Sequence, residues 1–217
     1  MGSQKNFAQG KLAVLFDLDG TLSDSLPLIQ HNYQEVFAEM DLPWDQGAVM
    51  NWIGVPLMDI ARHFAGEKAQ EFYTRYQHCF QRDHDAYTKL FPGTLAMLET
   101  LKEHQLKIAL VTSKGRPGTM RTVHFVGLAP YLDAVVTAHD VEKHKPHAEP
   151  VQKALSLLQV PACQAVFVGD SPFDLQAGQQ AGTEVLGVAW GMASVETLAA
   201  YQPKHVLACW EELYQYL

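Results

Sequence analysis

Short runs of aliphatic and β-branched residues recur along the chain, and segments with helical spacing separate them. The runs lie at residues 12–16, 106–111, 134–136, 165–168, 184–189 and 205–207. Between them, the segments at 94–103 and 150–158 repeat apolar residues every three or four positions, which is typical of helices. Strands that are apolar on both faces and alternate with helices predict an α/β fold with a doubly wound, Rossmann-like parallel sheet.

The block between about residues 24 and 89 breaks this alternation. It contains helical stretches at 26–40 and 67–84 but no convincing strand run. It follows the first strand directly, and the sheet pattern resumes near Phe91-Pro92-Gly93. We therefore expect a helical cap formed by residues 24–89, inserted into a Rossmann-like catalytic core formed by residues 1–23 and 90–217.

Charge and apolar content argue against several classes of partner. The net charge is −8 and Lys and Arg form no cluster, so no nucleic-acid partner is expected. The apolar runs are shorter than the roughly 20 residues of a membrane span, and residues 1–11 contain no apolar signal core. The three cysteines are widely separated, which fits a reducing compartment. We expect a cytoplasmic protein, a monomer or weak homodimer, that binds neither nucleic acid nor membrane.

Polar residues follow several of the predicted strands. In chain order these segments are Asp17-Leu18-Asp19-Gly20-Thr21, Thr112-Ser113-Lys114, Lys145-Pro146, and Gly169-Asp170-Ser171 with Asp174 beyond it. Taken alone, Asp-x-Asp-Gly also fits an ordinary turn, because Asp and Gly favour turns. The carboxyl ends of parallel strands meet at one edge of the sheet, however, so the segments together predict a ligand site at that edge.

The side chains of this set have the chemistry needed for phosphoryl transfer. Asp17 and Asp170 supply carboxylates of the kind that Mg²⁺ prefers, and the ion would offset the repulsion between Asp17 and an anionic phosphate. Asp17 is the candidate nucleophile, and nearby Asp19 is the candidate general acid and base. Thr112 and Lys145 are candidates to stabilise charge on the phosphoryl oxygens. These residues predict a Mg²⁺-dependent hydrolase that forms an aspartyl-phosphate intermediate.

The motifs FDLDGTLSDS, VTSK, HKPHAEP and VGDSPFDLQAG, in this order, resemble the four signature motifs of the haloacid-dehalogenase-like hydrolase superfamily. The resemblance covers nearly the whole chain outside the cap, and it implies the same nucleophile and the same general acid and base. It also implies that Thr112, with Ser113 beside it, and Lys145 bind phosphate. The Mg²⁺ ligands would be Asp17, Asp170 and the backbone carbonyl of Asp19, and Asp174 would support the metal site.

The cap and the stretches WIGVPL, HKPHAEPVQKAL and AGTEVLGVAW are similar to the phosphoglycolate phosphatase and pyrophosphatase branch of this superfamily. The resemblance implies a small phosphorylated metabolite as the substrate. Phosphoglycolate is the first choice, inorganic pyrophosphate is an alternative, and a β-phosphoglucomutase-like phosphomutase is another. The chain departs from the branch at Ser113, where Asn is common, and at Ala148-Glu149-Pro150, where Pro-Asp/Glu-Pro is common.

Substrate selection is expected to involve residues outside the core motifs. The segment at 52–56, which contains Gly54, interrupts the cap helices, and Arg62 follows it. Both are candidates to contact the leaving group, although an ordinary interhelical turn and a surface arginine would give the same pattern. Lys114, beside Thr112, is a further candidate for substrate binding, as is Arg116, although such residues are often only solvated. Asp174 could also simply cap the helix that follows it.

Three rival functions share this fold. A haloacid dehalogenase would use Asp17 to attack carbon, but it would need neither Asp19 nor the Asp170 metal position. A phosphomutase would share every core motif and differ in the cap. A non-catalytic protein would normally have lost one of the carboxylates or the lysine, and all are present in this chain.

Overall fold

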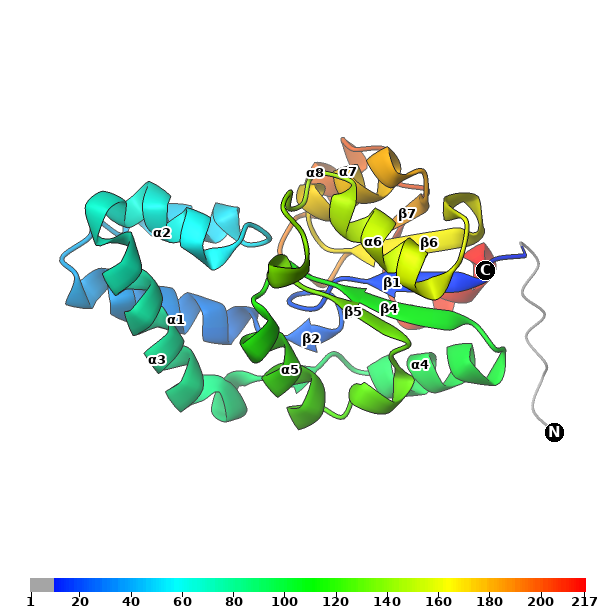
Figure 1. The fold of residues 1–217 in the computed structure, drawn as a ribbon, viewed down its shortest axis with the longest axis horizontal. Helices are drawn as coiled ribbons and strands as arrows, with labels where there is room; N and C mark the ends of the chain where they lie inside the picture. Colours follow the sequence, from blue (N-terminus) through cyan, green and yellow to red (C-terminus); the bar gives the residue numbers. More distant parts are fainter. Residues whose placement is uncertain (1–9) are drawn as a thin grey trace.

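The computed structural model describes residues 10–217 and divides into a sheet domain and a helical cap beyond one end of the sheet (Figure 1). The central sheet has six strands in the order β5-β4-β1-β6-β7-β8, and every neighbouring pair is parallel. The strands are β1 (Ala13–Phe16), β4 (Lys107–Val111), β5 (Ala134–Val136), β6 (Ala165–Gly169), β7 (Glu184–Val188) and β8 (His205–Leu207). This arrangement confirms the predicted doubly wound α/β fold.

Strand β1 lies at the centre of the sheet, between β4 and β6. All of its residues are fully buried, as expected for a parallel strand that is covered on both faces. In the register, Val14 lies opposite Ile108 of β4 and Val166 of β6. This position directs the residue after β1 to the middle of the sheet edge.

Helices cover both faces of the sheet (Figure 1). Helices α4 (Thr94–Glu103) and α5 (Arg116–Phe125), together with the C-terminal 3₁₀ segment η6 (Trp210–Tyr216), bury alternate strand residues such as Val14 and Phe16. Helices α6 (Glu149–Leu158), α7 (Pro172–Ala181) and α8 (Val195–Ala199) bury the other set, including Leu15 and Ala109. The alternation of side chains along each strand thus supplies two separate apolar layers.

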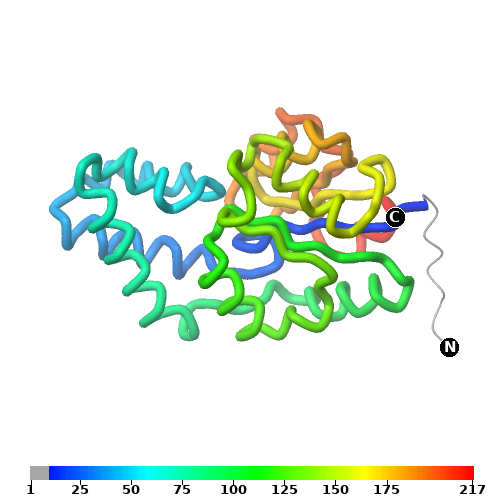
Figure 2. Tube along the Cα trace, in the orientation of Figure 1, coloured from blue at the N-terminus to red at the C-terminus, as the bar shows by residue number. Residues whose placement is uncertain are grey.

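The cap contains the helices α1 (Leu26–Glu39), α2 (Leu57–Ala65) and α3 (Ala69–Tyr87) and has an apolar core of its own. The chain enters and leaves it through β2 (Ser23–Asp24) and β3 (Lys89–Leu90), which pair antiparallel. The tube in Figure 2 shows the cap at the end of the sheet domain far from the C-terminus. The remaining 3₁₀ segments are η1 (Asp45–Trp52), η2 (Gly66–Lys68), η3 (Ala129–Tyr131), η4 (Ala138–Asp140) and η5 (Ala162–Gln164).

The cap also contacts the sheet domain where α3 ends. The imidazole of His84, on α3, is completely buried. Its Nε2 lies 2.9 Å from Thr122 Oγ1 on α5, and its Nδ1 lies 2.6 Å from Asp85 Oδ1. Arg121, also on α5, donates to Asp85 and to the backbone carbonyl of Gln81. These contacts fix the base of α3 against α5.

Within residues 10–217, none of the helices has both the length and the apolarity needed to cross a membrane. Residues 1–9 lie outside the described residues. They include the start of the predicted core and most of the segment 1–11, for which no apolar signal core is expected.

Candidate active site

The polar segments predicted from the sequence gather at the carboxyl ends of β1, β4 and β6. Asp17 follows β1, Thr112 follows β4 and Asp170 follows β6. The hydrogen bonds of the sheet continue into Asp17 and Thr112. The backbone N–H of Asp17 donates to the carbonyl of Val168 at 3.0 Å, and the backbone N–H of Thr112 donates to the carbonyl of Val136 at 2.9 Å. The sheet backbone therefore fixes where these side chains start.

Lys145 lies between η4 and α6, and its ammonium reaches into the same site. Its Nζ lies 2.6 Å from Asp17 Oδ1, 2.5 Å from Asp174 Oδ1 and 3.3 Å from the carbonyl of Val111. Burial disfavours the charged ammonium, but the carboxylates of Asp17 and Asp174 outweigh it and raise the pKa of Lys145 above its usual value. Lys145 is therefore charged, and it orients the Asp17 carboxylate.

Asp174 has two roles in the structure. Its Oδ2 accepts hydrogen bonds from Ser171 N at 3.1 Å and from Ser171 Oγ at 2.5 Å, and the hydroxyl of Ser171 accepts from the Asp174 N–H in return. This is a capping box at the start of α7. The other carboxylate oxygen binds Lys145, so Asp174 both begins the helix and holds the lysine.

Two glycines allow the Asp170 carboxylate to pack tightly against the first motif. A Cβ at Gly20, whose φ is +88°, would lie 2.1 Å from Asp170 Oδ2, and a Cβ at Gly191 would lie 2.1 Å from Asp170 Cβ. The backbone N–H of Met192 donates to Asp170 Oδ2 at 2.8 Å. Only glycine permits this approach at either position.

The donor set fits a hard divalent cation. Asp17, Asp170 and Asp174 each offer a carboxylate oxygen, and these atoms lie within 4.8 Å of one another. Burial raises the pKa of Asp17 to about 7 against the lowering effect of Lys145, and burial with the carboxylates of Asp174 and Asp17 raises that of Asp170 well above its usual value. Three buried carboxyl groups thus share one ammonium, that of Lys145, and a further positive charge would favour their ionised forms. Oxygen ligands of this kind suit Mg²⁺.

The side chain of Asp19 points away from this cluster and toward the cap. Its Oδ1 accepts hydrogen bonds from Ser25 Oγ at 2.5 Å and from Lys114 Nζ at 2.9 Å. The same ammonium lies 4.7 Å from the centroid of the Phe80 ring on α3. Lys114 therefore connects the candidate acid and base to the cap.

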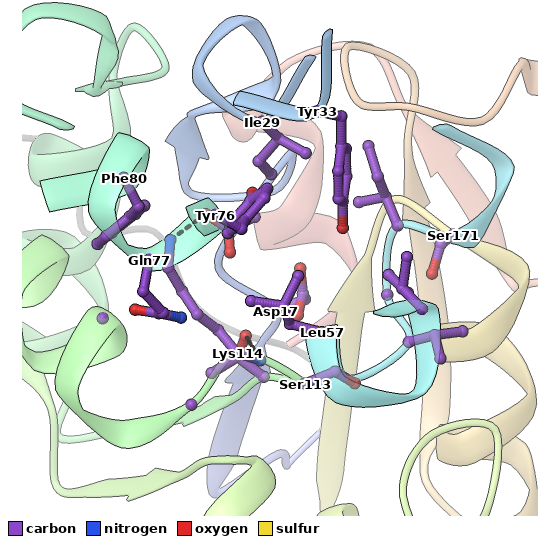
Figure 3. A pocket seen from close by; sticks show the side chains of 18 of the residues that line it. Asp17, Ile29, Tyr33, Leu57, Tyr76, Gln77, Phe80, Ser113, Lys114 and Ser171 are labelled. Atoms are coloured by element: carbon purple, nitrogen blue, oxygen red, sulfur yellow. Dashed lines mark hydrogen bonds and ion pairs between the residues drawn. The ribbon is translucent and has the colours of Figure 1, made fainter. Parts of the chain in front are cut away.

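A pocket lies between the carboxylates and the cap (Figure 3). The predicted site residues that line it are Asp17, Asp19, Gly54, Thr112, Ser113, Lys114, Asp170 and Asp174. Lys145 lies directly behind Asp17, to which it is bonded. The structure thus brings nearly all of the predicted residues to one place.

Arg62 is the exception. Its side chain is 67% exposed, and its Nη1 lies 2.8 Å from Asp59 Oδ1, one turn earlier on α2. It does not line the pocket, because α2 turns this face to solvent. Arg116 likewise pairs with Asp140, with Nη2 2.7 Å from Oδ2. The expected contact of Arg62 with the leaving group is therefore not supported by its position.

Most of the cap residues that form the opposite wall of the pocket are not among the residues predicted from the sequence. They include Ile29, Tyr33, Tyr73, Tyr76, Gln77 and Phe80. The last four stand at positions i, i+3, i+4 and i+7 on α3, so helical spacing could have placed them on one face. The direction of that face depends on how α1 and α3 pack, which the spacing does not determine.

Comparison with known proteins agrees with this geometry. Residues 14–188 match the family model described as "Haloacid dehalogenase-like hydrolase". The pyrophosphatase PpaX of Bacillus velezensis is 34% identical over 196 residues, covering 90% of this chain and 91% of that protein. The protein of the same name from Anoxybacillus flavithermus is 34% identical over 202 residues, covering 89% and 91%.

The fold also matches a solved structure. The crystal structure described as a predicted phosphoglycolate phosphatase, from Haemophilus somnus, superposes with a TM-score of 0.86 at 22% identity, covering 94% of this chain and 96% of that one. At this identity the match shows a shared fold only. The family match, the relatives and the site together lead to one conclusion: the chain belongs to the haloacid dehalogenase-like hydrolase family, and within it to the phosphatases.

Proposed function

We propose that this protein is a Mg²⁺-dependent phosphatase that hydrolyses a small phosphate ester through an aspartyl-phosphate on Asp17. The observation that carries the proposal is the buried contact of 2.6 Å between Lys145 Nζ and Asp17 Oδ1. A lysine held in this way keeps the carboxylate in a fixed direction and neutralises part of the charge that an incoming phosphate would meet. Both effects favour attack by Asp17 on phosphorus.

The chain's own residues account for the steps of this reaction. Asp17 attacks phosphorus, the bond from phosphorus to the leaving oxygen breaks, and Asp19 gives that oxygen its proton. A water molecule then attacks the aspartyl-phosphate and passes a proton to Asp19, which releases inorganic phosphate and restores Asp17. Thr112 and Ser113 line the pocket and would bind the phosphoryl oxygens, and the positive charge of Lys145 would act on them from behind Asp17. Splitting one displacement into two in this way is the usual advantage of covalent catalysis.

The metal would be held by Asp17, Asp170 and the backbone carbonyl of Asp19. When bound it supplies positive charge that offsets repulsion between the nucleophile and the phosphate. Asp174 would act indirectly, through its bonds to Lys145 and Ser171.

For the substrate, we propose phosphoglycolate first and inorganic pyrophosphate second. Both carry a second anionic group beyond the transferred phosphate. Lys114 supports this choice, because it is the only positively charged side chain among the described residues that line the pocket. The name of the PpaX relatives favours pyrophosphate. We further propose that the protein works on such metabolites in the cytoplasm, as a monomer or weak homodimer, without a nucleic-acid or membrane partner.

The decisive experiment is a phosphate-release assay over a panel of esters and pyrophosphate, with and without Mg²⁺. Release of phosphate from at least one small ester or from pyrophosphate, together with loss of activity in chelator, is the expected result. A hexose 1-phosphate in the panel tests the phosphomutase alternative, because a mutase would yield the 6-phosphate rather than free phosphate. Chloride release from a haloacid, without phosphate release from any substrate, would contradict the proposal.

A further inference from the structure

Two tyrosines of the cap face the catalytic carboxylates across the pocket. Tyr33 on α1 and Tyr76 on α3 pack against each other, with ring centroids 4.8 Å apart. The two residues are only 3% and 7% exposed, yet both line the pocket. Figure 3 shows their hydroxyl groups directed toward the space above Asp17. The cap therefore presents paired hydroxyls to whatever lies between it and the nucleophile.

Both hydroxyls keep their protons at neutral pH and above it, and so both can act as hydrogen-bond donors. Burial, with the negative charge of Asp19 nearby, raises the pKa of Tyr33, and burial followed by Tyr33 and Asp19 raises that of Tyr76. Within residues 10–217, no hydrogen bond links the Tyr33 hydroxyl to another side chain or backbone group. A hydroxyl that faces the pocket and has no protein partner can donate its hydrogen bond to a ligand in place of water.

The rest of the cap wall narrows the choice of ligand. Next to the tyrosines it is formed mainly by Ile29, Leu57, Ile60 and Phe80, with the amide of Gln77 as a further polar group. None of these side chains carries a charge. On the cap side of the pocket, hydrogen bonding therefore depends on neutral donors, and the positive charge comes from Lys114 on the sheet domain.

We propose that the hydroxyls of Tyr33 and Tyr76 form the subsite for the leaving group, and that both residues determine specificity. They would donate hydrogen bonds to carboxylate, phosphoryl or hydroxyl oxygens of the leaving group. The apolar wall around them limits the size of that group. The substrate class is therefore small phosphate compounds whose leaving group carries an oxygen acceptor near the bond that breaks. This inference rests on the proposed phosphatase function and adds the residues that choose the substrate.

The test compares Tyr33→Phe and Tyr76→Phe with wild type on matched substrates. Phosphoglycolate, glycerol phosphate and pyrophosphate are the oxygen-bearing substrates, because their leaving groups have oxygen acceptors besides the bridging oxygen. The leaving groups of ethyl phosphate and phenyl phosphate have the bridging oxygen alone. For the best oxygen-bearing substrate, each variant should lose about 10- to 100-fold in kcat/KM, as expected when a buried hydrogen bond to a charged or polar acceptor is removed. For ethyl and phenyl phosphate, kcat/KM should stay within about twofold of wild type, because Phe preserves the ring packing.

Tyr87→Phe is the matched control, because Tyr87 is 43% exposed and lies outside the pocket. It should leave every kcat/KM unchanged. The outcome that would contradict the subsite is a wild-type ratio of kcat/KM, in both pocket variants, between the oxygen-bearing substrates and ethyl or phenyl phosphate. The subsite assignment would then be wrong while the phosphatase function stands. If wild type releases phosphate from none of the substrates, both the proposed function and the subsite assignment are wrong.

Discussion

Lys114 Nζ lies 2.9 Å from Asp19 Oδ1 and, in the same position, 4.7 Å from the centroid of the Phe80 ring. The first contact is with the sheet domain and the second with the cap. An ammonium held between a carboxylate and an aromatic face is attracted to both. It lines the pocket, so an anionic leaving group would compete with Asp19 for this ammonium.

Replacing Lys114 by Met should therefore affect substrates unequally. For phosphoglycolate and pyrophosphate, kcat/KM should fall by about 10- to 100-fold, the usual effect of losing a hydrogen bond between charged groups. For phenyl phosphate, whose leaving group is uncharged, the loss should be smaller. Arg62→Met is the matched control and should change neither, because Arg62 faces solvent and pairs with Asp59. Steady-state kinetics on these substrates would decide, and equal losses for all of them would leave Lys114 without a role in selecting the leaving group.

Asp17→Asn should abolish turnover without unfolding the protein, because the amide has nearly the same shape but is a poor nucleophile. Less than about one per cent of wild-type activity should remain. Intact-protein mass spectrometry after rapid quenching should find a phosphorylated species in wild type and none in the variant. Asp59→Asn, on the exposed face of α2, controls for the chemical change alone. Substantial turnover by a clean Asp17→Asn preparation would rule out the covalent role.

Asp19→Ala should remove general acid catalysis, which contributes roughly 10²- to 10⁴-fold. The loss should shrink when the leaving group is already acidic, as in nitrophenyl phosphate, since such a group leaves without a proton. Rates measured over a series of aryl phosphates would reveal this as a steeper dependence on the leaving-group pKa. A defect of the same size across the series would instead assign Asp19 a structural role.

Removing the metal should affect both activity and stability. Chelation should abolish turnover, Mg²⁺ should restore it and Ca²⁺ should restore it poorly, because calcium prefers more ligands at longer distances. Mg²⁺ should also raise the Tm of wild type, because it relieves the repulsion among buried carboxylates and binds only the folded state. Asp170→Asn should lose this Tm increase. Full activity in excess chelator, or an unchanged Tm response in the variant, would contradict the site.

The contact between α3 and α5 should make stability depend on pH. Burial lowers the pKa of His84 below its ordinary 6.5, with Lys114 and Arg121 acting in the same direction and the hydrogen bond to Asp85 opposing them. Below the ordinary value the unfolded chain takes up a proton that the folded protein does not, so the contribution of His84 to the free energy of unfolding falls as pH falls. The pKa of Asp85 is also lowered, and it changes the free energy of unfolding only in more acidic solution.

This dependence can be measured by denaturant unfolding between about pH 7 and pH 5, around the ordinary histidine pKa. His84→Gln keeps a polar partner for Thr122 but cannot titrate, and it should flatten the slope. An identical slope in wild type and His84→Gln would show that His84 does not cause it.

The sheet domain could be predicted in detail because its signals are local. The helix at Thr94–Glu103 and the strand at Ala134–Val136 have the bounds expected from the sequence. Strand β4 begins at Lys107, one residue later than expected, because the chain is still leaving the turn at Gln105, where φ is +61°. In a parallel sheet the ends of neighbouring strands are forced together, which is why the gathering of polar segments at that edge could be foreseen. The catalytic roles assigned to these residues stay predictions.

The wall formed by the cap could not be foreseen in the same way. Tyr33 and Tyr76 are separated by α2 in the sequence, and they meet only because α1 and α3 pack side by side. An aromatic residue on an amphipathic helix looks the same whether it enters a core or lines a pocket. The direction of the Arg62 side chain could not be predicted from the sequence either, because it depends on how α2 is rotated about its axis.

The short β2–β3 ladder has a consequence for how a protein like this can diversify. Both crossings of the chain lie next to each other at Ser23–Asp24 and Lys89–Leu90, and the apolar cluster of the cap shares no residue with those of the sheet domain. The cap is thus joined to the sheet domain by two adjacent chain crossings and by side-chain contacts such as that between His84 and Thr122. Substitutions inside the cap, away from these contacts, leave the packing around the nucleophile unchanged. The wall that faces the substrate can therefore vary while Asp17 and its neighbours stay in place.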